Sequence, residues 1–302
     1  LFVSHEMFGR GIFLIASGLF KKAIISDYIS VNFVERIFDN PTLYSGVENL
    51  MGVYGYALQI YCDFSGYSDM AIGIALLLGF HFNKNFDSPY KSASITEFWR
   101  RWHISLTTWF RDYIYIPLGG SRVGKWKSFR NTLVIFLVSG FWHGANWTFV
   151  AWGAYHALLF LPLLLLGQNR RYRDSVAENS FLPSVKELTQ MGVTFLLVLL
   201  GWILFRSEDI SQAAVYLERM FNASLFSAPQ LVGLGFGQLL LKKCFFFTAL
   251  MFVVEWIGRK QAHGLMIEDL SLPVRYVIYT VLLIIIYGFD ASNPQGFIYF
   301  QF

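Results

Sequence analysis

The amino-acid sequence predicts an all-α, polytopic membrane protein. Of its 302 residues, 55% are hydrophobic and 15% are charged, whereas an ordinary soluble protein has about 25% charged residues. Several apolar runs approach the roughly 20 residues that a helix needs to cross a hydrocarbon core about 30 Å thick. Basic residues gather in short segments between these runs, which is typical of cytoplasmic loops. By length alone, the chain holds about seven or eight membrane segments.

Composition also excludes several classes of function. The net charge of +4 comes with basic residues in short loops, a pattern that sets membrane topology and does not indicate a nucleic-acid partner. Cys62 and Cys244 lie in apolar runs and form neither a disulfide framework nor a metal site. The sequence contains no phosphate-binding glycine loop, dinucleotide fingerprint or His–Cys cluster, so we expect no metal and no bound cofactor. Because Leu1 is not an initiator and no signal peptide precedes the first apolar run, we expect a piece that lacks earlier membrane helices.

The first apolar runs carry unexpected charges. Residues 7–25 predict a short helix that stops at Lys21 and Lys22, whose long side chains can reach the lipid headgroups. Read as one helix, residues 47–80 would be about 50 Å long, too long for one crossing. A polar cluster from Asp63 to Asp69 interrupts this run, so we predict two helices that meet at a break or a sharp kink. Asp63 and Asp69 are candidates for a buried polar network; the alternative is an interface loop in water.

A second helix start follows at Ser94. With Glu97 three residues later, Ser94 has the spacing of a capping box. The following helix is predicted to be amphipathic and to suit the membrane interface or the rim of a cavity, ending at residues 116–121 because proline removes a donor and two glycines permit positive φ. Its apolar face comprises Trp99, Trp102, His103, Leu106, Trp109, Phe110 and Tyr113, and its polar face Arg100, Arg101, Ser105, Thr108, Arg111 and Asp112. His103 should therefore point towards the membrane-buried body; the alternative is a packed core histidine.

Residues 141–147 (FWHGANW) hold the main candidate site. Basic segments at residues 122–130 and 170–173 bracket this unit, so both are expected on the cytoplasmic side and the chain between them goes in and returns. Residues 131–142 number only 12 and rise about 18 Å, which predicts a re-entrant hairpin with His143 at membrane depth. An ionisable side chain at that depth indicates a functional site. The indole N–H groups of Trp142 and Trp147 and the amide of Asn146 lie close to it in sequence and strengthen this hypothesis. The alternative is a core histidine held by one hydrogen bond.

The remaining chain predicts further membrane segments. Residues 168–186 are the most polar stretch and form a loop, and residues 188–205 form a span. Residues 207–221 predict a short amphipathic helix, opened by acidic residues that suit a helix N-terminus. Residues 245–257 and 274–289 predict two more spans, and the ending at residues 297–302 is too short for a helix of its own.

A buried imidazole suits one kind of chemistry, general base catalysis on a hydroxyl. An alcohol that attacks an acyl thioester needs a water-poor site reachable from both sides of the membrane, and a re-entrant turn provides one. Burial should keep His143 neutral and able to accept a proton. Asn146 or a tryptophan N–H is expected to stabilise the developing oxyanion, an effect worth about 3 kcal/mol. A non-enzymatic transporter or polymer-export channel, lined by the histidines and aspartates, is the rival hypothesis.

The same motifs resemble those of a known family. Residues 94–122 and 138–156 are similar to the membrane-bound O-acyltransferase (MBOAT) family, and within it to the bacterial alginate O-acetyltransferase branch. Residues 18–22, 61–69 and 297–302 resemble that branch too. The resemblance implies a helical bundle in which a funnel meets a tunnel, with His143 as the catalytic histidine and His103 as the second hallmark histidine. Our further candidates for substrate or tunnel residues are Trp99, Trp142, Asn146, Asp63 and Asp69.

The resemblance also implies an activity and a setting. It implies O-acetyl transfer in the bacterial inner membrane, from acetyl-CoA or another acyl thioester to an exported, alginate-like polysaccharide. Periplasmic esterase-like or acetyltransferase partners and membrane lipid are the expected partners, and no nucleic acid is expected. Related branches modify peptidoglycan or move D-alanine to teichoic acid from a carrier protein. We therefore expect residues 1–302 to form a single membrane-embedded acyltransferase domain that lacks the N-terminal membrane helices of full-length relatives.

Overall fold

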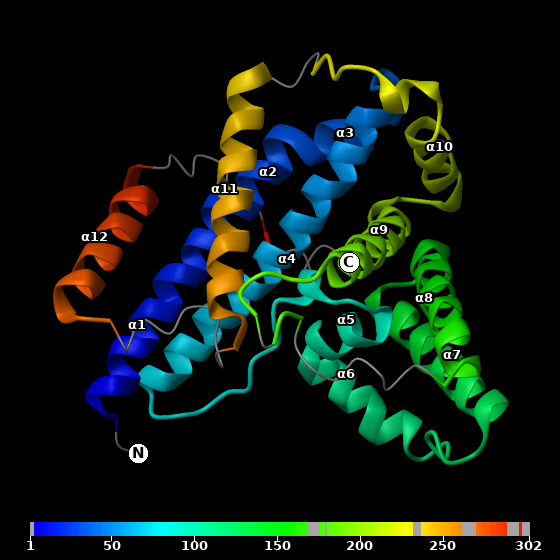
Figure 1. Ribbon diagram of the computed structural model, residues 1–302, viewed down its shortest axis with the longest axis horizontal. Helices are drawn as coiled ribbons and strands as arrows, with labels where there is room; N and C mark the ends of the chain where they lie inside the picture. Colours follow the sequence, from blue (N-terminus) through cyan, green and yellow to red (C-terminus); the bar gives the residue numbers. More distant parts are fainter. Residues whose placement is uncertain are drawn as a thin grey trace. The chain divides into compact units, whose positions relative to one another are not determined.

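The computed structural model describes residues 3–167, 176–178, 180–231, 237–260, 270–288 and 296–297, and all regular structure in these ranges is helical (Figure 1). The chain forms two compact units. The first contains Leu1–Asn85 and Arg219–Phe302, and the second contains Phe86–Glu218. The two units are described separately below, and the prediction of one membrane-embedded domain stays a prediction.

In the first unit, the N-terminal helix does not stop at the two lysines as predicted. Helix α1 (His5–Leu19) continues through π-helical turns (Phe20–Ser26 and Ser30–Val34), α2 (Asp27–Ile29) and α3 (Glu35–Asp39). The lysines point inward: Lys21 pairs with Asp69 at 2.8 Å, and Lys22 pairs with both Asp27 and Asp63 at 2.6 Å. Carboxylates from other turns replace the water that the ammonium groups lose on burial, so the helix does not have to end at an interface.

The predicted break in residues 47–80 is also wrong. Helix α4 (Gly46–Leu77) is one helix of 32 residues, opened by a capping box between Ser45 and Glu48. Asp63 is 2% exposed, and its ion pair with Lys22 satisfies it without interrupting the helix. The buried polar network that we predicted is therefore confirmed, but it lies inside a continuous helix. Burying a charge is costly unless the charge is paired, and Lys22 supplies that pair for Asp63.

Glycines let α1 and α4 pack closely. Gly11 and Gly18 on α1 face Gly73 and Gly66 on α4, so each helix presents two glycines seven residues apart on one face. A Cβ atom on Gly66 would lie 2.6 Å from the Gly18 carbonyl oxygen, and one on Gly73 equally close to the Gly11 oxygen. Small residues allow such close backbone approach, which drives helix association in membranes.

Helices α11 (Gly237–Ile257) and α12 (Leu272–Gly288) confirm the helices predicted at residues 245–257 and 274–289. Of the loop predicted at residues 168–186, the structure describes 176–178 and 180–186. Residues 176–178 and 180–184 are not helical, as predicted, and the next helix begins at Val185. The prediction for residues 297–302 lies outside the described residues apart from Phe297. Helix α10 (Ile210–Met220) confirms the predicted short helix at residues 207–221.

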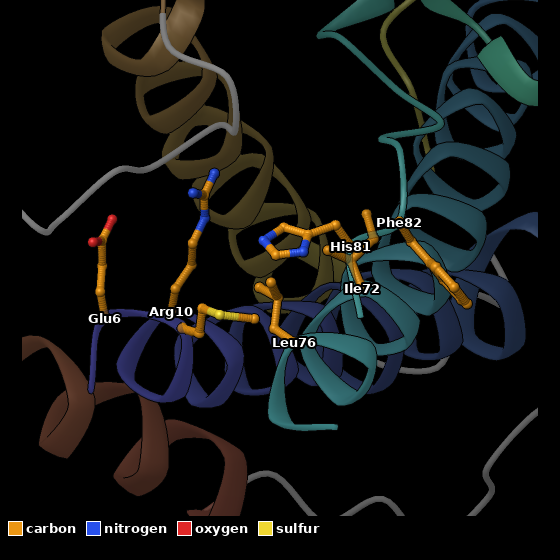
Figure 2. A pocket seen from close by; sticks show the side chains of 7 residues that line it. Glu6, Arg10, Ile72, Leu76, His81 and Phe82 are labelled. Carbon is orange, nitrogen blue, oxygen red and sulfur yellow. The ribbon is translucent and has the colours of Figure 1, made fainter. Parts of the chain in front are cut away.

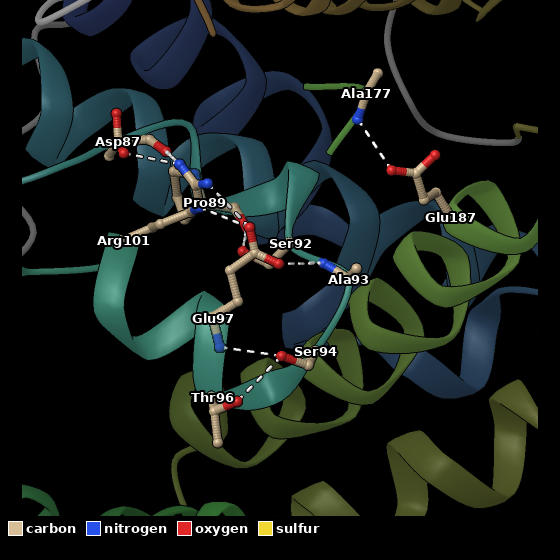
Figure 3. Close-up of polar contacts among 10 residues, drawn as sticks. All are labelled: Asp87, Pro89, Ser92, Ala93, Ser94, Thr96, Glu97, Arg101, Ala177 and Glu187. Carbon is tan, nitrogen blue, oxygen red and sulfur yellow. Dashed lines mark hydrogen bonds and ion pairs between the residues drawn. The ribbon is translucent and has the colours of Figure 1, made fainter. Parts of the chain in front are cut away.

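In the second unit, the helix predicted to start at Ser94 does so, but one hydrogen bond of the predicted capping box has a different donor. Ser94 Oγ accepts from the Glu97 N–H at 3.2 Å, as predicted. The Glu97 carboxylate, however, accepts from the Ala93 N–H at 2.8 Å, one residue before the cap, and also binds Arg101 (Figure 3). Arg101 in turn pairs with Asp87 at 2.7 Å. This network fixes the start of α5 (Ile95–Arg101).

The predicted amphipathic helix is broken in the middle. Helix α5 ends at Arg101, α6 (Ile104–Phe110) follows, and between them His103 has φ +43° and ψ +57°. The residues of the predicted apolar face therefore do not share one environment. Trp102 is 2% exposed, whereas Trp109 and Tyr113 are 50% and 68% exposed. A π-helical turn (Arg111–Tyr115) then leads to the turn that the proline and glycines at residues 117–120 were predicted to form.

Helices α7 (Lys125–His143) and α8 (Trp147–Leu165) pack as a hairpin, and α9 (Val185–Arg206) packs against α8. The predicted short arm is wrong, because α7 begins at Lys125 and has 19 residues, a rise of about 28 Å. Two described helices, α8 and α9, are long and apolar enough to cross a membrane. Helix α9 confirms the span predicted at residues 188–205. Figure 3 also shows Glu187, in its capping box with Ser184, binding the Ala177 N–H at 3.0 Å.

Candidate active site

His143 is the last residue of α7 and lies at the tip of the α7–α8 hairpin. A tight turn follows it at Gly144, where a Cβ atom would lie 2.6 Å from the Phe149 ring. Glycine is therefore needed for the chain to pass this ring. The turn aims the imidazole back between α8 and α9, where it is only 7% exposed.

Aromatic rings surround the imidazole of His143. The ring centroids of Trp142, Trp152 and Phe205 lie 4.9, 5.3 and 5.0 Å from it, each in an edge-to-face arrangement. Phe149 adds a fourth ring at 6.3 Å. These side chains come from α7, α8 and α9, so three helices build one water-poor box. We call these four rings the aromatic box.

The box has an open side and a closed side. Trp152 and Phe205 are 1% and 2% exposed, whereas Trp142 is 53% exposed. His103 is half-buried beyond Trp142, and their ring centroids are 6.2 Å apart. The structure therefore brings the two predicted histidines together on either side of one indole, whose exposed edge is the open side of the box.

The backbone of His103 is unusual. A non-glycine residue with positive φ is uncommon, and holding it costs on the order of 1–3 kcal/mol. The left-handed conformation separates α5 from α6 and turns the imidazole away from the regular stripe that we predicted. Its Nδ1 lies 3.5 Å from the hydroxyl of Ser105.

Both ends of the Asn146 side-chain amide form hydrogen bonds in the turn after His143. Its Oδ1 accepts from the Thr148 N–H at 3.0 Å and caps α8. Its Nδ2 donates to the Glu208 carbonyl at 2.6 Å. In this structure both ends of the amide hold the turn after His143, so Asn146 orients the hairpin tip.

Sequence reasoning missed a third histidine. His156 on α8 is fully buried, and its Nδ1 accepts from Trp99 Nε1 at 3.3 Å. Trp152 lies between the two buried histidines, with centroids 5.3 Å from His143 and 5.2 Å from His156. The signal was the four-residue step from Thr148 through Trp152 to His156, which places all three on one face of α8. Trp99, predicted as a substrate or tunnel residue, lies behind this face and holds His156.

The two predicted aspartates belong to the first unit. There Asp63 and Asp69 pair with Lys22 and Lys21, and Tyr61 donates to the buried carboxylate of Glu255 nearby on α11. Among the described residues, no group of histidine, cysteine and carboxylate side chains has the arrangement of a metal site.

The sequence of the chain is similar to those of known acyltransferases. Residues 5–181 match the membrane-bound O-acyltransferase family. The chain is 41% identical to a probable alginate O-acetylase of Pseudomonas aeruginosa over 78% of its own length. It is 39% identical to a peptidoglycan O-acetyltransferase of Helicobacter pylori over 72% of its length. It is also 30% identical to a teichoic acid D-alanyltransferase of Bacillus subtilis over 67% of its length.

The chain spans about half the length of the curated relatives it matches, because these alignments cover 44%, 40% and 52% of the three proteins. The matched family region contains α1 to α8, and with them His143, three of the four rings of the aromatic box and the break at His103; Phe205, on α9, lies beyond it. The chain therefore belongs to the membrane-bound O-acyltransferase family.

Proposed function

We propose that this protein is a membrane O-acetyltransferase that moves an acetyl group from a cytoplasmic thioester to a hydroxyl of an exported polysaccharide. The observation that supports it best is the pairing of His143 and His103 across Trp142, with His143 enclosed by the aromatic box. The 41% identity to a probable alginate O-acetylase supports an alginate-like acceptor.

In the proposed reaction, His143 is the general base. Its imidazole takes the proton from the acceptor hydroxyl as the oxygen attacks the thioester carbonyl. The tetrahedral intermediate then collapses, the carbon–sulfur bond breaks, and the proton passes to the leaving thiolate. The products are an O-acetyl ester and a free thiol, so no oxidant, reductant or metal is required. General base catalysis of this kind contributes about 10²–10⁴-fold.

The aromatic box supports this role through its effect on the imidazole. Four rings around His143 disfavour a charged ring and exclude competing water, which would hydrolyse the thioester. A neutral imidazole is the form that accepts a proton. The indole N–H of exposed Trp142 is the proposed donor to the oxyanion, since the Asn146 amide is engaged in capping.

Access from two sides completes the proposal. Acetyl-CoA or another acyl thioester would arrive from the cytoplasm and the polymer from the opposite face of the inner membrane. We place the meeting point of the two paths at His143, next to the exposed edge of Trp142. A periplasmic esterase-like partner would carry the acetyl group or present the polymer.

The relatives suggest three candidate acceptors, in the order of their identity to the chain. The identities to the alginate and peptidoglycan relatives, 41% and 39%, are nearly equal, which favours peptidoglycan as the second candidate. D-Alanine transfer is a third, with lower identity of 30%.

The test uses membranes containing the full protein, radiolabelled acetyl-CoA, and alginate or peptidoglycan as acceptor. His143→Ala and His143→Gln should lower ester formation by at least about 10²-fold while the protein remains in the membrane at normal amounts. His5→Gln, which changes an exposed histidine of the first unit, is the matched control and should not change the rate.

Normal ester formation by His143→Ala would refute the catalytic role. Polymer passage without release of free thiol would instead support a transporter. Ester formation only when a D-alanyl carrier protein is supplied would move the assignment to D-alanine transfer.

A further inference from the structure

His81 and His156 take no part in the proposed reaction and lie in different surroundings. Figure 2 shows His81, with Arg10 and Glu6, lining a surface pocket of about 300 Å³ in the first unit. His81 is exposed, so water can satisfy its ring nitrogens. His156, on α8 of the second unit, is 0% exposed, and a buried polar group needs partners from the protein. What His156 does therefore depends on the side chains around it.

A hydrogen bond fixes which ring nitrogen of His156 carries the hydrogen. Nδ1 accepts from Trp99 Nε1 at 3.3 Å, so in the neutral ring the hydrogen is on Nε2. Nε2 is buried and has no hydrogen-bond partner among the described residues. Leaving a buried donor unpaired costs stability, and an apolar side chain of similar size would avoid that cost. Stability alone therefore does not account for a histidine at this position.

Helix α9 packs directly against Nε2. A Cβ atom on Gly201 would lie 2.5 Å from Nε2 and 3.1 Å from Cε1 of His156. Only a glycine at position 201 leaves room for the imidazole. Because Trp99 binds one ring nitrogen and the backbone of α9 lies against the other, the ring of His156 is held in one position.

Trp152 connects the position of His156 to that of His143. The ring centroid of Trp152 lies 5.2 Å from that of His156 and 5.3 Å from that of His143. Trp99 completes a triangle of rings, with its centroid 4.9 Å from His156 and 5.5 Å from Trp152. Protein interiors are close-packed and transmit strain, so a shift of one ring displaces its neighbours. A displaced Trp152 would change the closed side of the aromatic box.

We propose that His156 is a positioning residue for the acyl transfer: bound by Trp99 and confined by Gly201, it holds Trp152 in place against His143. His156 touches neither a substrate nor a reacting atom. It acts by setting the distance between the indole of Trp152 and the imidazole of His143. This inference rests on the proposed function, in which His143 is the general base.

Gly201→Ala tests the position of His156 without changing an aromatic ring. The added methyl group would have to push the imidazole by about 1 Å to reach ordinary contact at 3.4 Å, and a displacement of that size can lower a rate by about 10²-fold. In membranes containing the full protein, kcat for acetyl transfer should fall by about 10- to 10²-fold, while KM for acetyl-CoA stays within about twofold. Gly192→Ala, on the exposed part of α9 with nothing within 4 Å of the added atom, is the matched control and should keep kcat.

Two substitutions of His156 separate the hydrogen bond from the shape of the side chain. His156→Asn and His156→Leu introduce side chains of nearly the same shape, and both remove Nε2 and Cε1, which makes room for a methyl group on residue 201. Asparagine keeps an acceptor for Trp99 at the position of Nδ1, whereas leucine does not. His156→Asn combined with Gly201→Ala should be at least about tenfold more active than the product of the two single losses. His156→Leu combined with Gly201→Ala should stay about tenfold below the asparagine pair.

The positioning role is refuted if Gly201→Ala keeps kcat within about twofold, or if it lowers only the amount of folded protein. Equal activity of the asparagine and leucine pairs would refute the role of the bond to Trp99. A proton relay through His156 needs an imidazole, so an asparagine pair that shows no recovery would overturn positioning in favour of a relay. Failure of the proposed function is a separate outcome, because His143→Ala would then retain ester formation whatever the His156 and Gly201 variants do.

Discussion

The close packing of α7 on α8 can be tested at Gly140 and Gly153. A Cβ atom on Gly140 would lie 2.9 Å from the carbonyl carbon of Phe149 and closer still to its oxygen, and one on Gly153 would meet the carbonyl of Phe136 in the same way. Ordinary contact begins at 3.4 Å. Because the obstacles are backbone atoms that cannot rotate away, Gly140→Ala or Gly153→Ala should push the helices apart by roughly 0.5–1 Å.

Such a shift should affect activity more than stability. Overpacking costs about 1–3 kcal/mol, partly offset by the higher helix propensity of alanine, worth up to about 1 kcal/mol. His143 lies one turn after Gly140, and Trp152 is next to Gly153, so the imidazole that we propose as the base would move relative to the aromatic box. A displacement of about 1 Å can lower a rate by about 10²-fold. The acetyl-transfer assay in membranes, with protein amount measured by immunoblot, should show a loss approaching this value.

A matched control is available on α9. Gly192 is exposed and has nothing within 4 Å of an added Cβ atom, so Gly192→Ala should keep full activity and gain up to about 1 kcal/mol of stability. Activity of Gly140→Ala within twofold of the unmodified protein would refute the reasoning. An equal loss in Gly192→Ala would refute it too, because the effect would then not come from the interhelical contact.

Three further predictions concern single side chains. Asn146→Ala removes the cap on the Thr148 N–H and should lower the unfolding free energy by about 1 kcal/mol, whereas Asn146→Asp keeps the capping oxygen; equal losses in thermal unfolding would contradict the capping role. Lys22→Met leaves Asp63 buried without its cation and should cost about 3–5 kcal/mol, and adding Asp63→Asn should recover part of the thermal stability if the ion pair is the cause. His103→Gly relaxes the left-handed backbone and should raise stability by about 1 kcal/mol while lowering acetyl transfer; retained activity would assign His103 a purely conformational role.

Part of the candidate site could be predicted from the sequence. The pattern of residues 141–147 indicated His143, and the apolar stripe of the helical region after Ser94 pointed to His103, which the structure brings to the same indole. The sequence also predicted that Asn146 lies in a turn. It could not predict that the Asn146 amide donates to the carbonyl of Glu208, which is distant in the sequence. Trp152 and Phe205 could not be assigned to the box, because their contacts depend on how α8 and α9 pack.

The sequence by itself determined what depends on local order. Hydropathy and three-to-four-residue periodicity predicted the helices that became α9, α10, α11 and α12, and the capping residues at Ser94 and the glycines after Pro117 placed a helix start and a turn, because these features need only neighbours along the chain.

Only the tertiary structure decided whether charged and polar residues would interrupt those helices. The run through Asp63 stays helical because Lys22, about forty residues earlier in the chain, neutralises the carboxylate. The regular stripe around His103 breaks at its left-handed backbone, and its ring lies 6.2 Å from that of Trp142, about forty residues later in the chain. A sequence gives the cost of burying such a group, but the group that compensates it comes from a distant segment and is known only once the chain has folded.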